Sequence, residues 1–532
     1  MRKFIAYTLL VIIGILIGIT GTLYSTRSYL KNIYGTISQK EGETKIGYLL
    51  RALDEMYVDS IDIEKIDEAT VALALEQLDP HSAYIPKEDM DVATQELSGS
   101  FSGVGIQFNI QQDTIYVVDV IPGGPSERAG IMAGDRITHI DDTLYAGKKI
   151  TTDKVFKKLR GERNSIVKLT IARRGTKEPL HFTIKRDDIP VHTVNAAHML
   201  TPTVGYINIS SFGSNTYSEA LTALAKLKRQ GATSMIIDLR GNPGGYLDAA
   251  TNLINEFLSA GDMIVYVEGR VYARQEFKAT GTGSFQNIPV VILIDEFSGS
   301  ASEIFAGAMQ DNDRGKVIGR RSFGKGLVQR PVSFKDGSEA RITIARYYTP
   351  AGRCIQKPYE KGKVADYEHD LWNRYVHGEF FNADSIHQND TTKYYTTKGR
   401  VVYGGGGITP DIFIGRDTTG FSPSFTRMVN KTAIYRFSLR YVDGHRAELK
   451  RYKTLDELES YLLKQNLVDE LVKFARSENI EVTARDIAIS RNLMSQHINS
   501  YIIRSVLTED DFYHILNKYD KTVLRAIKEA EN

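Results

Sequence analysis

Residues 289–311 read PVVILIDEFSGSASEIFAGAMQD, and this stretch predicts a buried strand that turns directly into a helix. The β-branched apolar run at 290–294 is typical of a buried parallel strand. Apolar residues then recur at helical spacing over 304–309, and Glu303 in the first turn suits the positive end of the helix dipole. Ser300 is therefore expected on the strand-to-helix turn.

A turn of this kind exposes a hydroxyl beside free backbone amides, here those of Ser300 or Ala301, as acyl transfer requires for its oxyanion. A serine needs a base, and a desolvated lysine serves once its pKa falls to roughly 7–8. Lys325, within FGKGLVQ at 323–329, is the candidate because its neighbours are glycine and apolar residues. Gln329 projects to the same face of an extended segment and can hold the ammonium without stabilising it as an anion would.

Each of these motifs also has a plain structural interpretation. Serine-rich helix starts usually act as caps, and a Gly-Lys-Gly segment is usually an exposed turn or a phosphate loop. The phosphate interpretation fails here, because the segment lacks the spaced glycines and the Lys-Ser/Thr pair of a P-loop. The occurrence of both motifs in one chain favours the catalytic interpretation.

The SASEI motif at 300–304 and the FGKGLVQ motif at 323–329 together resemble the C-terminal processing peptidases, also called tail-specific proteases. These are S41-type serine peptidases that use a Ser–Lys dyad. The resemblance implies Ser300 as the nucleophile, Lys325 as the base and Gln329 as the residue that orients the lysine.

A third motif of this family falls on DLRGNPGG at 238–245, after the apolar strand 235–237. By resemblance, Gly244 and Gly245 belong to an oxyanion-hole loop that faces the nucleophile, together with the amide of Ala301. The competing interpretation is a tight strand-to-helix turn, for which glycine is equally suited.

Other reactive side chains receive minor roles. Some family members use an aspartate at the position of Asp311, but a carboxylate touching the lysine would raise its pKa, so we expect a structural or supporting task. His81 is expected to be structural. Cys354 lacks a base motif and is not expected to be a nucleophile. No histidine spacing typical of a metal site occurs, and we expect neither a metal nor a cofactor.

A second module upstream resembles a PDZ domain, through SGVGI at 102–106 and PSERAGIMAGDRI at 125–137. In that fold a glycine-rich loop binds the terminal carboxylate of a peptide, and the peptide adds a strand to the sheet edge. The expected partners are therefore protein substrates, bound by their C-terminal tails. The carboxylate-binding loop is expected at Gly103, Val104, Gly105 and Ile106.

The chain opens with an uncharged apolar run, 4–23, that is long enough to span a bilayer as a helix. No small-x-small cleavage site is evident around 24–25, which favours a retained membrane anchor over a signal peptide. Basic residues flank both ends and leave the orientation open. The family resemblance implies a bacterial envelope protein, anchored in the inner membrane with its catalytic domains outside the cytoplasm, on the periplasmic side.

Alternating strand and helix patterns after residue 200 predict an α/β protein, and the resemblance implies a crotonase-like (ClpP/crotonase-type) protease core with an inserted PDZ domain. The N- and C-terminal regions are expected to be helical. The expected division is 1–25 anchor or signal segment, 26–96 helical region, 97–187 PDZ domain, 188–357 protease core, 358–401 insertion, 402–418 end of the core, and 419–532 helical extension.

Composition adds few limits. The 532 residues carry 67 Lys and Arg against 65 Asp and Glu, and this net charge of +2 suggests no nucleic-acid partner. The single cysteine, Cys354, excludes a disulfide within one chain. An adaptor protein and a homo-oligomer are left open as partners, as are the natural substrate and the roles of 358–401 and the C-terminal extension.

The sequence thus predicts a serine endopeptidase that binds C-terminal tails and cleaves through an acyl-enzyme. The main alternative is a catalytically silent or adaptor-gated tail-binding protein on the same fold. A PDZ protease with a Ser-His-Asp triad is disfavoured because Pro243 occupies the nucleophile position of its loop. A thioester-processing enzyme would have little use for a PDZ domain.

Overall fold

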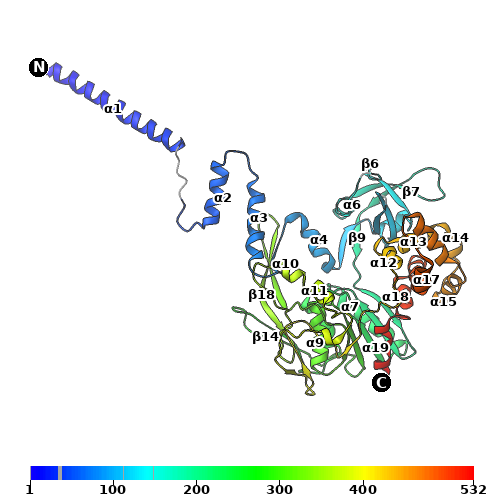
Figure 1. Cartoon of the computed structure of the whole chain (residues 1–532). Helices are drawn as coiled ribbons and strands as arrows, with labels where there is room; N and C mark the ends of the chain where they lie inside the picture. The colour runs from blue at the N-terminus through cyan, green and yellow to red at the C-terminus, as the bar shows by residue number, and fades with distance from the viewer. Residues whose placement is uncertain (1, 34–38, 112, 148) are drawn as a thin grey trace. The chain divides into compact units, whose positions relative to one another are not determined.

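A computed structural model of the chain describes residues 2–33, 39–111, 113–147 and 149–532 (Figure 1). Residues 34–38, 112 and 148, which fall within the expected helical and PDZ ranges, lie outside the described residues. The chain divides into two units, Met1–Gln77 and Leu78–Asn532.

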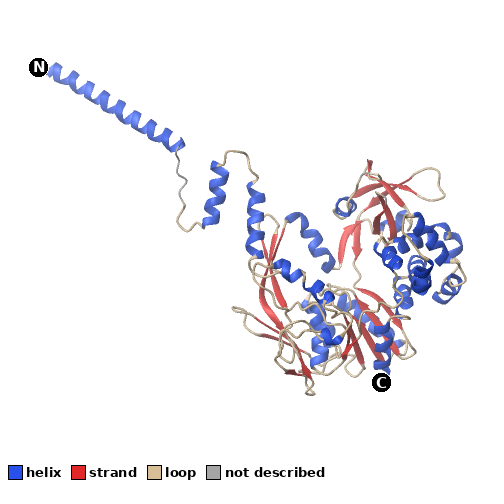
Figure 2. Cartoon of the chain, viewed as in Figure 1, coloured by secondary structure: helices blue, strands red, loops and turns tan. Residues whose placement is uncertain are grey.

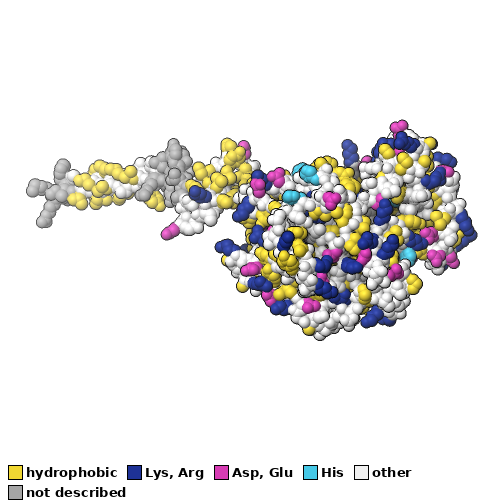
Figure 3. Space-filling view, turned by 60° about the horizontal axis from the view of Figure 1, so that its bottom comes forward, with side chains coloured by type: hydrophobic (Ala, Val, Ile, Leu, Met, Phe, Trp, Pro, Cys, Tyr) yellow, Lys and Arg dark blue, Asp and Glu magenta, His cyan; other side chains and the backbone are white. Residues whose placement is uncertain are grey.

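The described residues of the first unit form three helices. Within the first of them, Tyr7–Thr26 has a mean hydropathy of 2.0 and is long and apolar enough to cross a membrane. Figure 3 shows hydrophobic side chains along the described part of this helix. The other two begin at capping side chains, because Thr44 and Asp62 each accept a hydrogen bond from a first-turn amide. The bounds are α1 (Arg2–Ile33), α2 (Lys45–Met56) and α3 (Ile63–Glu76).

A six-stranded sheet forms the centre of the second unit, in the order β10-β11-β12-β15-β16-β21. Neighbours pair in parallel except for the edge pair β10 and β11. The predicted strand at Val290–Ile294 is the interior strand β15, and all five of its residues are buried. The other bounds are β10 (Val194–Met199), β11 (Val204–Ile209), β12 (Ser234–Asp238), β16 (Lys316–Gly319) and β21 (Ile412–Phe413).

Helices cover both faces of this sheet, as Figure 2 shows in blue and red. Alternate strand residues point to opposite faces, so Ile292 packs in one apolar cluster and Leu293 in another. The first cluster includes helices α7 (Thr216–Arg229), α8 (Leu247–Asn255) and α9 (Ala301–Asp311). Burial on both faces explains why the strands read as continuous apolar runs.

A second sheet carries the lysine segment. It has the order β1-β18-β13-β14, and β17 forms an antiparallel pair with β18. Lys325 lies just before β17, so the hairpin of β17 and β18 fixes the direction in which the segment runs. The bounds are β1 (Ala83–Ile85), β13 (Met263–Glu268), β14 (Gln275–Lys278), β17 (Leu327–Ser333) and β18 (Glu339–Tyr348).

A small β domain, residues 100–190, is inserted after α4 (Lys87–Ser98). Its sheet runs β3-β4-β5-β7-β8, with β6 on β5, and β2 pairs with β9 at the point where the chain enters and leaves. Strand β3 is an edge strand. The bounds are β2 (Ser100–Gly103), β3 (Ile106–Gln111), β4 (Thr114–Val120), α5 (Pro125–Ala129), β5 (Arg136–Ile140), β6 (Thr143–Leu144), α6 (Thr152–Leu159), β7 (Ile166–Ala172), β8 (Leu180–Lys185) and β9 (Asp187–Pro190).

The C-terminal region is helical, as the sequence predicts. Six helices, α12 to α17, pack around an apolar core of their own, which we call the helical domain. Their bounds are α12 (Pro423–Asn430), α13 (Ala433–Gly444), α14 (Arg446–Leu449), α15 (Leu455–Leu462), α16 (Leu467–Ser477) and α17 (Ala484–Val506).

The last helices leave this domain and return to the central sheet. Helices α18 (Glu509–Asn517) and α19 (Lys521–Glu531) follow the helical domain, and α19 packs on the second face of the sheet. Val523 and Ala526 lie there against Tyr206 and Leu293. The C-terminal segment is therefore not one separate extension, because its last helix completes the core sheet.

Placing a charge under α19 should destabilise the sheet. Val523 is fully buried, whereas its neighbour Leu524 is 42% exposed. We expect Val523→Asp to lower the free energy of unfolding by about 3 kcal/mol or more, because an unpaired carboxylate would be buried. Leu524→Asp is the matched control and should cost less than about 0.5 kcal/mol. Equal urea midpoints for the two variants would contradict this packing.

Candidate active site

Ser300 occupies a strained turn between β15 and α9. Its backbone angles are φ 54° and ψ −114°, a conformation that residues with a side chain rarely adopt. The helix that follows is buried along its whole length, and the Ser300 residue itself is only 8% exposed. The predicted strand-turn-helix is therefore present, with the serine at the first turn of a helix that cannot shift freely.

A single carboxylate, that of Glu303, joins this turn to the lysine loop. Its Oε2 accepts hydrogen bonds from the backbone amides of Ser300 and Lys325, each at 2.8 Å. Its Oε1 accepts from the Ser322 hydroxyl at 2.5 Å and from the Gly324 amide at 2.7 Å. Burial raises the pKa of Glu303 to about 7, and these four hydrogen bonds act against that rise.

Sequence analysis predicted Glu303 only as a favourable charge at a helix start. A Ser-x-x-Glu spacing is also the pattern of a capping box, in which the glutamate reaches back to the amide of the capping residue. The Glu303 bond to Ser300 follows that pattern. The three bonds to residues 322–325 had no signal in the local sequence.

The loop that carries Lys325 is held by its backbone on every side. Gly324 has φ 90°, and a Cβ on it would lie 3.0 Å from the Cβ of Lys357, so only glycine fits without strain. Beyond Glu303, four further hydrogen bonds fix the loop. They are Phe323 N to Ser298 O (2.9 Å), Lys357 N to Gly324 O (2.9 Å), Gly326 N to Gln356 Oε1 (2.8 Å) and Tyr347 N to Gly326 O (2.8 Å).

The Lys325 ammonium donates a hydrogen bond to Gln329 Oε1 at 3.3 Å. The amide nitrogen of Gln329 donates to the backbone carbonyl of His81. Because a carbonyl can only accept, this second bond turns the oxygen of Gln329 toward the lysine. Gln329 therefore orients Lys325 without adding negative charge.

Burial lowers the pKa of Lys325, and the positive charge of Arg341 lowers it further. The charges of Glu303 and Asp79 act in the opposite direction. Within the part of the chain that the structure describes, Lys325 forms no ion pair. A partly buried lysine without a carboxylate partner is the kind of amine that can lose its proton near neutral pH.

Tyr347, a residue that sequence reasoning did not assign to the site, lies near enough to the Ser300 side chain for that hydroxyl to act on the pKa of its phenol. Burial raises the pKa of Tyr347 to about 12, so the phenol stays protonated. Across the described residues, no hydrogen bond joins the Ser300 hydroxyl to the Lys325 ammonium. Glu303 thus holds the backbones of the two residues together, while the Lys325 side chain bonds Gln329 and not the serine.

The glycine-rich loop at 238–245 passes directly over the serine. A Cβ on Gly244 would lie 2.7 Å from the Cβ of Ser300, and both Gly244 and Gly245 have positive φ. The amide of Gly244 donates to Asn242 Oδ1 at 2.8 Å. Among the described residues the amides of Gly245 and Ala301 donate no hydrogen bond. Of the predicted oxyanion donors, these two are the ones open to a ligand.

The start of α19 anchors the same loop. Arg240 donates to Asp238 at 2.6 Å and to Asp520 at 2.7 Å, and the Tyr206 hydroxyl donates to Asp238 at 2.7 Å. Asp520 is the residue that caps α19. The last helix therefore holds the glycine-rich loop as well as covering the sheet.

The insertion at 358–401 supports the lysine loop from the outside. The Tyr367 hydroxyl bonds His81 Nε2 at 2.8 Å, next to the carbonyl that orients Gln329. Arg374 donates to the backbone oxygens of Arg321 (2.7 Å) and Ser322 (3.0 Å). Tyr367 lies on α10 (Val364–Glu368) and Arg374 lies on α11 (Asp370–Val376). Burial lowers the pKa of His81 to about 4, so this histidine is neutral at physiological pH.

Asp311 lies away from the lysine. It ends α9 at the opposite end from Ser300, about 15 Å along the helix axis. Its carboxylate pairs with Arg353 at 2.7 Å, and both side chains are fully buried. This ion pair ties the helix to the turn after β18, which is a structural arrangement. Cys354, beside it in sequence, has its pKa raised by burial.

The predicted carboxylate loop of the β domain leads into the edge strand β3. Gly105 has φ 76°, and the carbonyls of Val104 and Gly105 accept hydrogen bonds from Ser126 and Ile121 at 3.0 Å each. In the described part of the chain, the amides of Val104 and Gly105 donate no hydrogen bond. Helix α6 flanks β3, with the rings of Phe108 and Phe156 4.9 Å apart. Free amides beside an unpaired strand edge can accept an extended peptide with a carboxylate end.

Three family models match parts of the chain. Residues 203–368 match peptidase family S41, and residues 116–173 match a PDZ domain. Residues 424–508, which make up most of the helical domain, match a family of unknown function.

Curated relatives are identical to the chain at about a third of the aligned positions. The carboxy-terminal processing protease CtpB of Bacillus subtilis is 34% identical over 316 residues, or 59% of this chain and 65% of that protein. The carboxy-terminal processing protease CtpA of the same organism is 31% identical over 375 residues, or 69% of this chain and 79% of that protein. A solved structure, the photosystem II D1 C-terminal processing protease, aligns with a TM-score of 0.34 at 29% identity, covering 58% of this chain and 83% of that one.

The hydrogen bonds by which Glu303 joins the turn of Ser300 to the loop of Lys325 can be tested with the substitution Glu303→Gln. Glutamine keeps the shape but turns an NH₂ group toward donors that need an acceptor, so we expect a loss of about 3 kcal/mol in the free energy of unfolding. The measurement is urea unfolding at pH 8, above the pKa of Glu303, which is about 7. Glu162→Gln, at an exposed position, is the control and should leave stability unchanged. A neutral result at Glu303 would show that the four hydrogen bonds do not hold the two segments together.

Proposed function

The chain belongs to the S41 family of carboxy-terminal processing proteases, and we propose that it is a serine endopeptidase that cleaves peptide bonds with a Ser300–Lys325 dyad. One observation carries the proposal. A lysine with a lowered pKa and no ion pair among the described residues is fixed by its backbone, through Glu303, to a serine in a strained turn. This combination supports acyl transfer, because it supplies a nucleophile and a base that can be neutral at pH 7.

In the proposed reaction the neutral Lys325 amine takes the proton of the Ser300 hydroxyl as its oxygen attacks the substrate carbonyl carbon. The resulting oxyanion accepts hydrogen bonds from the amides of Gly245 and Ala301. As the intermediate collapses, the lysine gives its proton to the leaving amine, and a serine ester remains. Water, deprotonated by the same lysine, then releases the acid product.

Before the first step, the lysine side chain must change partners. The Lys325 amine leaves Gln329 as it approaches the Ser300 hydroxyl. Gln329 serves as the acceptor that keeps the lysine directed while it is protonated. The NH₂ group of the same side-chain amide donates to the backbone carbonyl of His81, and this second hydrogen bond gives Gln329 one orientation only.

The PDZ domain is proposed to bind the C-terminal tails of protein substrates. Free amides at Val104 and Gly105 support binding of the terminal carboxylate, and the open edge of β3 supports strand addition. Gly103 and Ile106 flank these amides as ends of β2 and β3. A tail held there would present the preceding residues of the substrate for cleavage.

We also propose that α1 is a retained membrane anchor of a bacterial envelope protein, with the catalytic part on the periplasmic side. The apolar stretch Tyr7–Thr26 supports an anchor or a signal segment. The mass of the N-terminal peptide of the purified protein distinguishes a retained anchor from a cleaved signal segment.

A crotonase-like core is supported by the parallel sheet and its covering helices. We keep the proposed core ranges 188–357 and 402–418 and add α19 to them.

An adaptor-gated tail-binding protein is the second candidate, and one observation favours it. Among the described residues no hydrogen bond joins the Ser300 hydroxyl to the Lys325 ammonium, which donates to Gln329 instead. A partner or a bound tail that brings the two side chains together would then switch the enzyme on.

The proposed function is tested by incubating the full chain, in detergent, with an unfolded protein that has an apolar C-terminal tail. We expect cleavage that is lost in Ser300→Ala, reduced at least about 1,000-fold in Lys325→Ala, and weakened when the tail is amidated. Lys361→Ala, at an exposed lysine, is the control and should cleave as wild type does. Tail binding without cleavage by the wild type would favour the gated alternative. Full cleavage by Lys325→Ala would exclude the dyad.

The neutral character of Gln329 gives a pH prediction. The base acts when neutral, so the rate should rise with pH through the pKa of Lys325, which burial has lowered. In Gln329→Glu a carboxylate would raise that pKa, and the rising limb of the kcat profile should move to higher pH. Gln329→Met adds no charge and should lower kcat without moving the limb upward. Identical profiles for the two variants would contradict the role of Gln329.

A further inference from the structure

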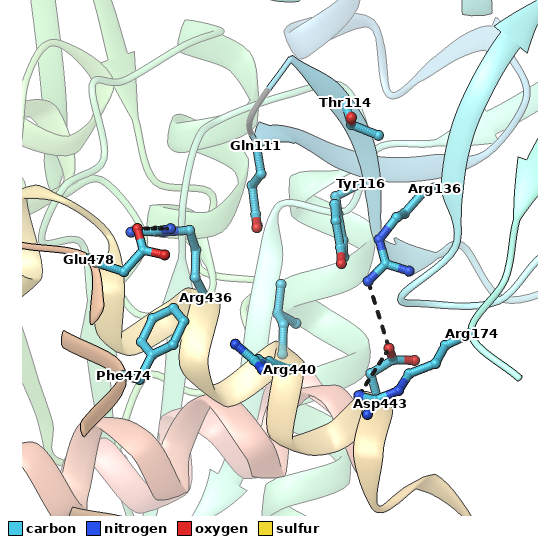
Figure 4. A pocket seen from close by; sticks show the side chains of 11 residues that line it. Gln111, Thr114, Tyr116, Arg136, Arg174, Arg436, Arg440, Asp443, Phe474 and Glu478 are labelled. Carbon is cyan, nitrogen blue, oxygen red and sulfur yellow. Dashed lines mark hydrogen bonds and ion pairs between the residues drawn. The ribbon is translucent and has the colours of Figure 1, made fainter. Parts of the chain in front are cut away.

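A large cavity lies between the PDZ domain and the helical domain, away from the proposed catalytic residues. Its volume is about 620 Å³. Strands of the PDZ domain form one wall, and helices α13 and α16 form the other (Figure 4). This volume is in the range of pockets that bind small molecules, about 300–1,000 Å³.

The cavity carries an excess of positive charge. Four arginines line it, against two carboxylates, those of Asp443 and Glu478. The lining arginines are Arg136 and Arg174 from the PDZ domain and Arg436 and Arg440 from α13. On the face of the molecule that Figure 3 shows, basic and acidic side chains are interspersed.

The two carboxylates do not neutralise these arginines. Asp443 is shared by Arg136 at 4.0 Å, Arg174 at 3.9 Å and Arg446, just outside the cavity, at 3.1 Å. One carboxylate cannot satisfy three guanidinium groups, each of which has five N–H donors. These contacts therefore leave donors on the PDZ wall directed at the cavity.

On the opposite wall, Glu478 pairs with Arg436 at 2.8 Å. Arg440 forms no ion pair among the described residues, and its guanidinium lies 5.9 Å from the centre of the Phe474 ring. Figure 4 shows Arg440 on α13, across the cavity from the PDZ wall that carries Gln111 and Tyr116. An exposed arginine held over an aromatic ring presents its planar fork at low entropic cost.

We propose that this cavity binds a small multivalent anion, a polyphosphate or a polycarboxylate, that bridges the PDZ domain and the helical domain. Two unbalanced positive charges call for at least two acidic groups. Guanidinium forks bind phosphate and carboxylate oxygens in the same bidentate way. The Tyr116 hydroxyl and the Gln111 amide add polar contacts that suit either chemistry.

Because the arginines come from both domains, the bound anion would fasten the PDZ domain to the helical domain. In the structure the two domains are joined there by the ion pairs of Asp443 with Arg136 and Arg174 and by the hydrogen bond from Arg446 to the Ala133 carbonyl. An anion would add contacts to the same interface. The proposal is independent of the catalytic assignment, since it uses no residue of the serine and lysine site.

The test is calorimetric titration of the full chain, in detergent and at constant ionic strength, with tripolyphosphate and separately with citrate. We expect saturable binding of at least one of them, at one site per chain. Arg440→Ala and Arg174→Ala, one from each wall, should each raise the Kd at least tenfold. Arg485→Ala, an exposed arginine elsewhere in the helical domain, is the matched control and should bind as wild type does.

Binding of tripolyphosphate alone would identify a phosphate ligand, and binding of citrate alone a carboxylate ligand. Arg440→Lys keeps the charge without the fork and should recover part of the affinity, and this variant is used if Arg440→Ala lowers the melting temperature. The proposal is overturned if neither probe binds at millimolar concentration or if the two wall variants bind normally. It is also overturned if Arg485→Ala weakens binding equally, or if only one wall contributes.

Discussion

The buried carboxylate of Glu303 is the constraint on which the arrangement of the two proposed catalytic residues depends. Burying such a group is costly unless its oxygens are hydrogen-bonded, and each oxygen here has two donors. The donors come from the turn of Ser300 and from the loop of Lys325, so neither segment can move without leaving part of a buried charge unsatisfied. One side chain thereby sets the spacing between the backbones of the proposed nucleophile and the proposed base.

Segments that are distant in the sequence support the turn of Ser300, the loop of Lys325 and the glycine-rich loop beside them. Asp520, at the start of the last helix, holds Arg240 and with it the glycine-rich loop. Tyr367 and Arg374, from the insertion, hold the outer side of the lysine loop. The same helix buries its apolar face on the central sheet. Regions that resemble appendages in the sequence are thus parts of the site's framework, and their loss is expected to disturb the glycine-rich loop at 238–245 as well as the core.

The motifs at 300–304 and 323–329 could be predicted because their signals are local. A strand pattern followed by a helix pattern fixes the turn, and glycines around a lysine indicate a close approach of backbone. The partners could not be predicted in the same way. The bond from Glu303 to the lysine loop spans 22 residues and that from Asp520 spans 280. Tyr347 lies in a strand, where the local sequence indicates that an aromatic side chain is buried but not which residue it lies beside. Contacts of this kind follow from the tertiary packing, and a single sequence carries no periodic signal for them.

The hydrogen bonds that position the site also control its electrostatics. A base lysine must keep anions at a distance, yet Glu303 and Asp79 both lie close enough to act on the pKa of Lys325. Each of these carboxylates is engaged by other donors, Glu303 by four and Asp79 by its own turn and by β18. Neither is left free to pair with the ammonium, which bonds the neutral amide of Gln329. Saturating the nearby anions with donors therefore leaves the amine without an ion pair, as its proposed role as a base requires, and burial can lower its pKa without an opposing charge partner.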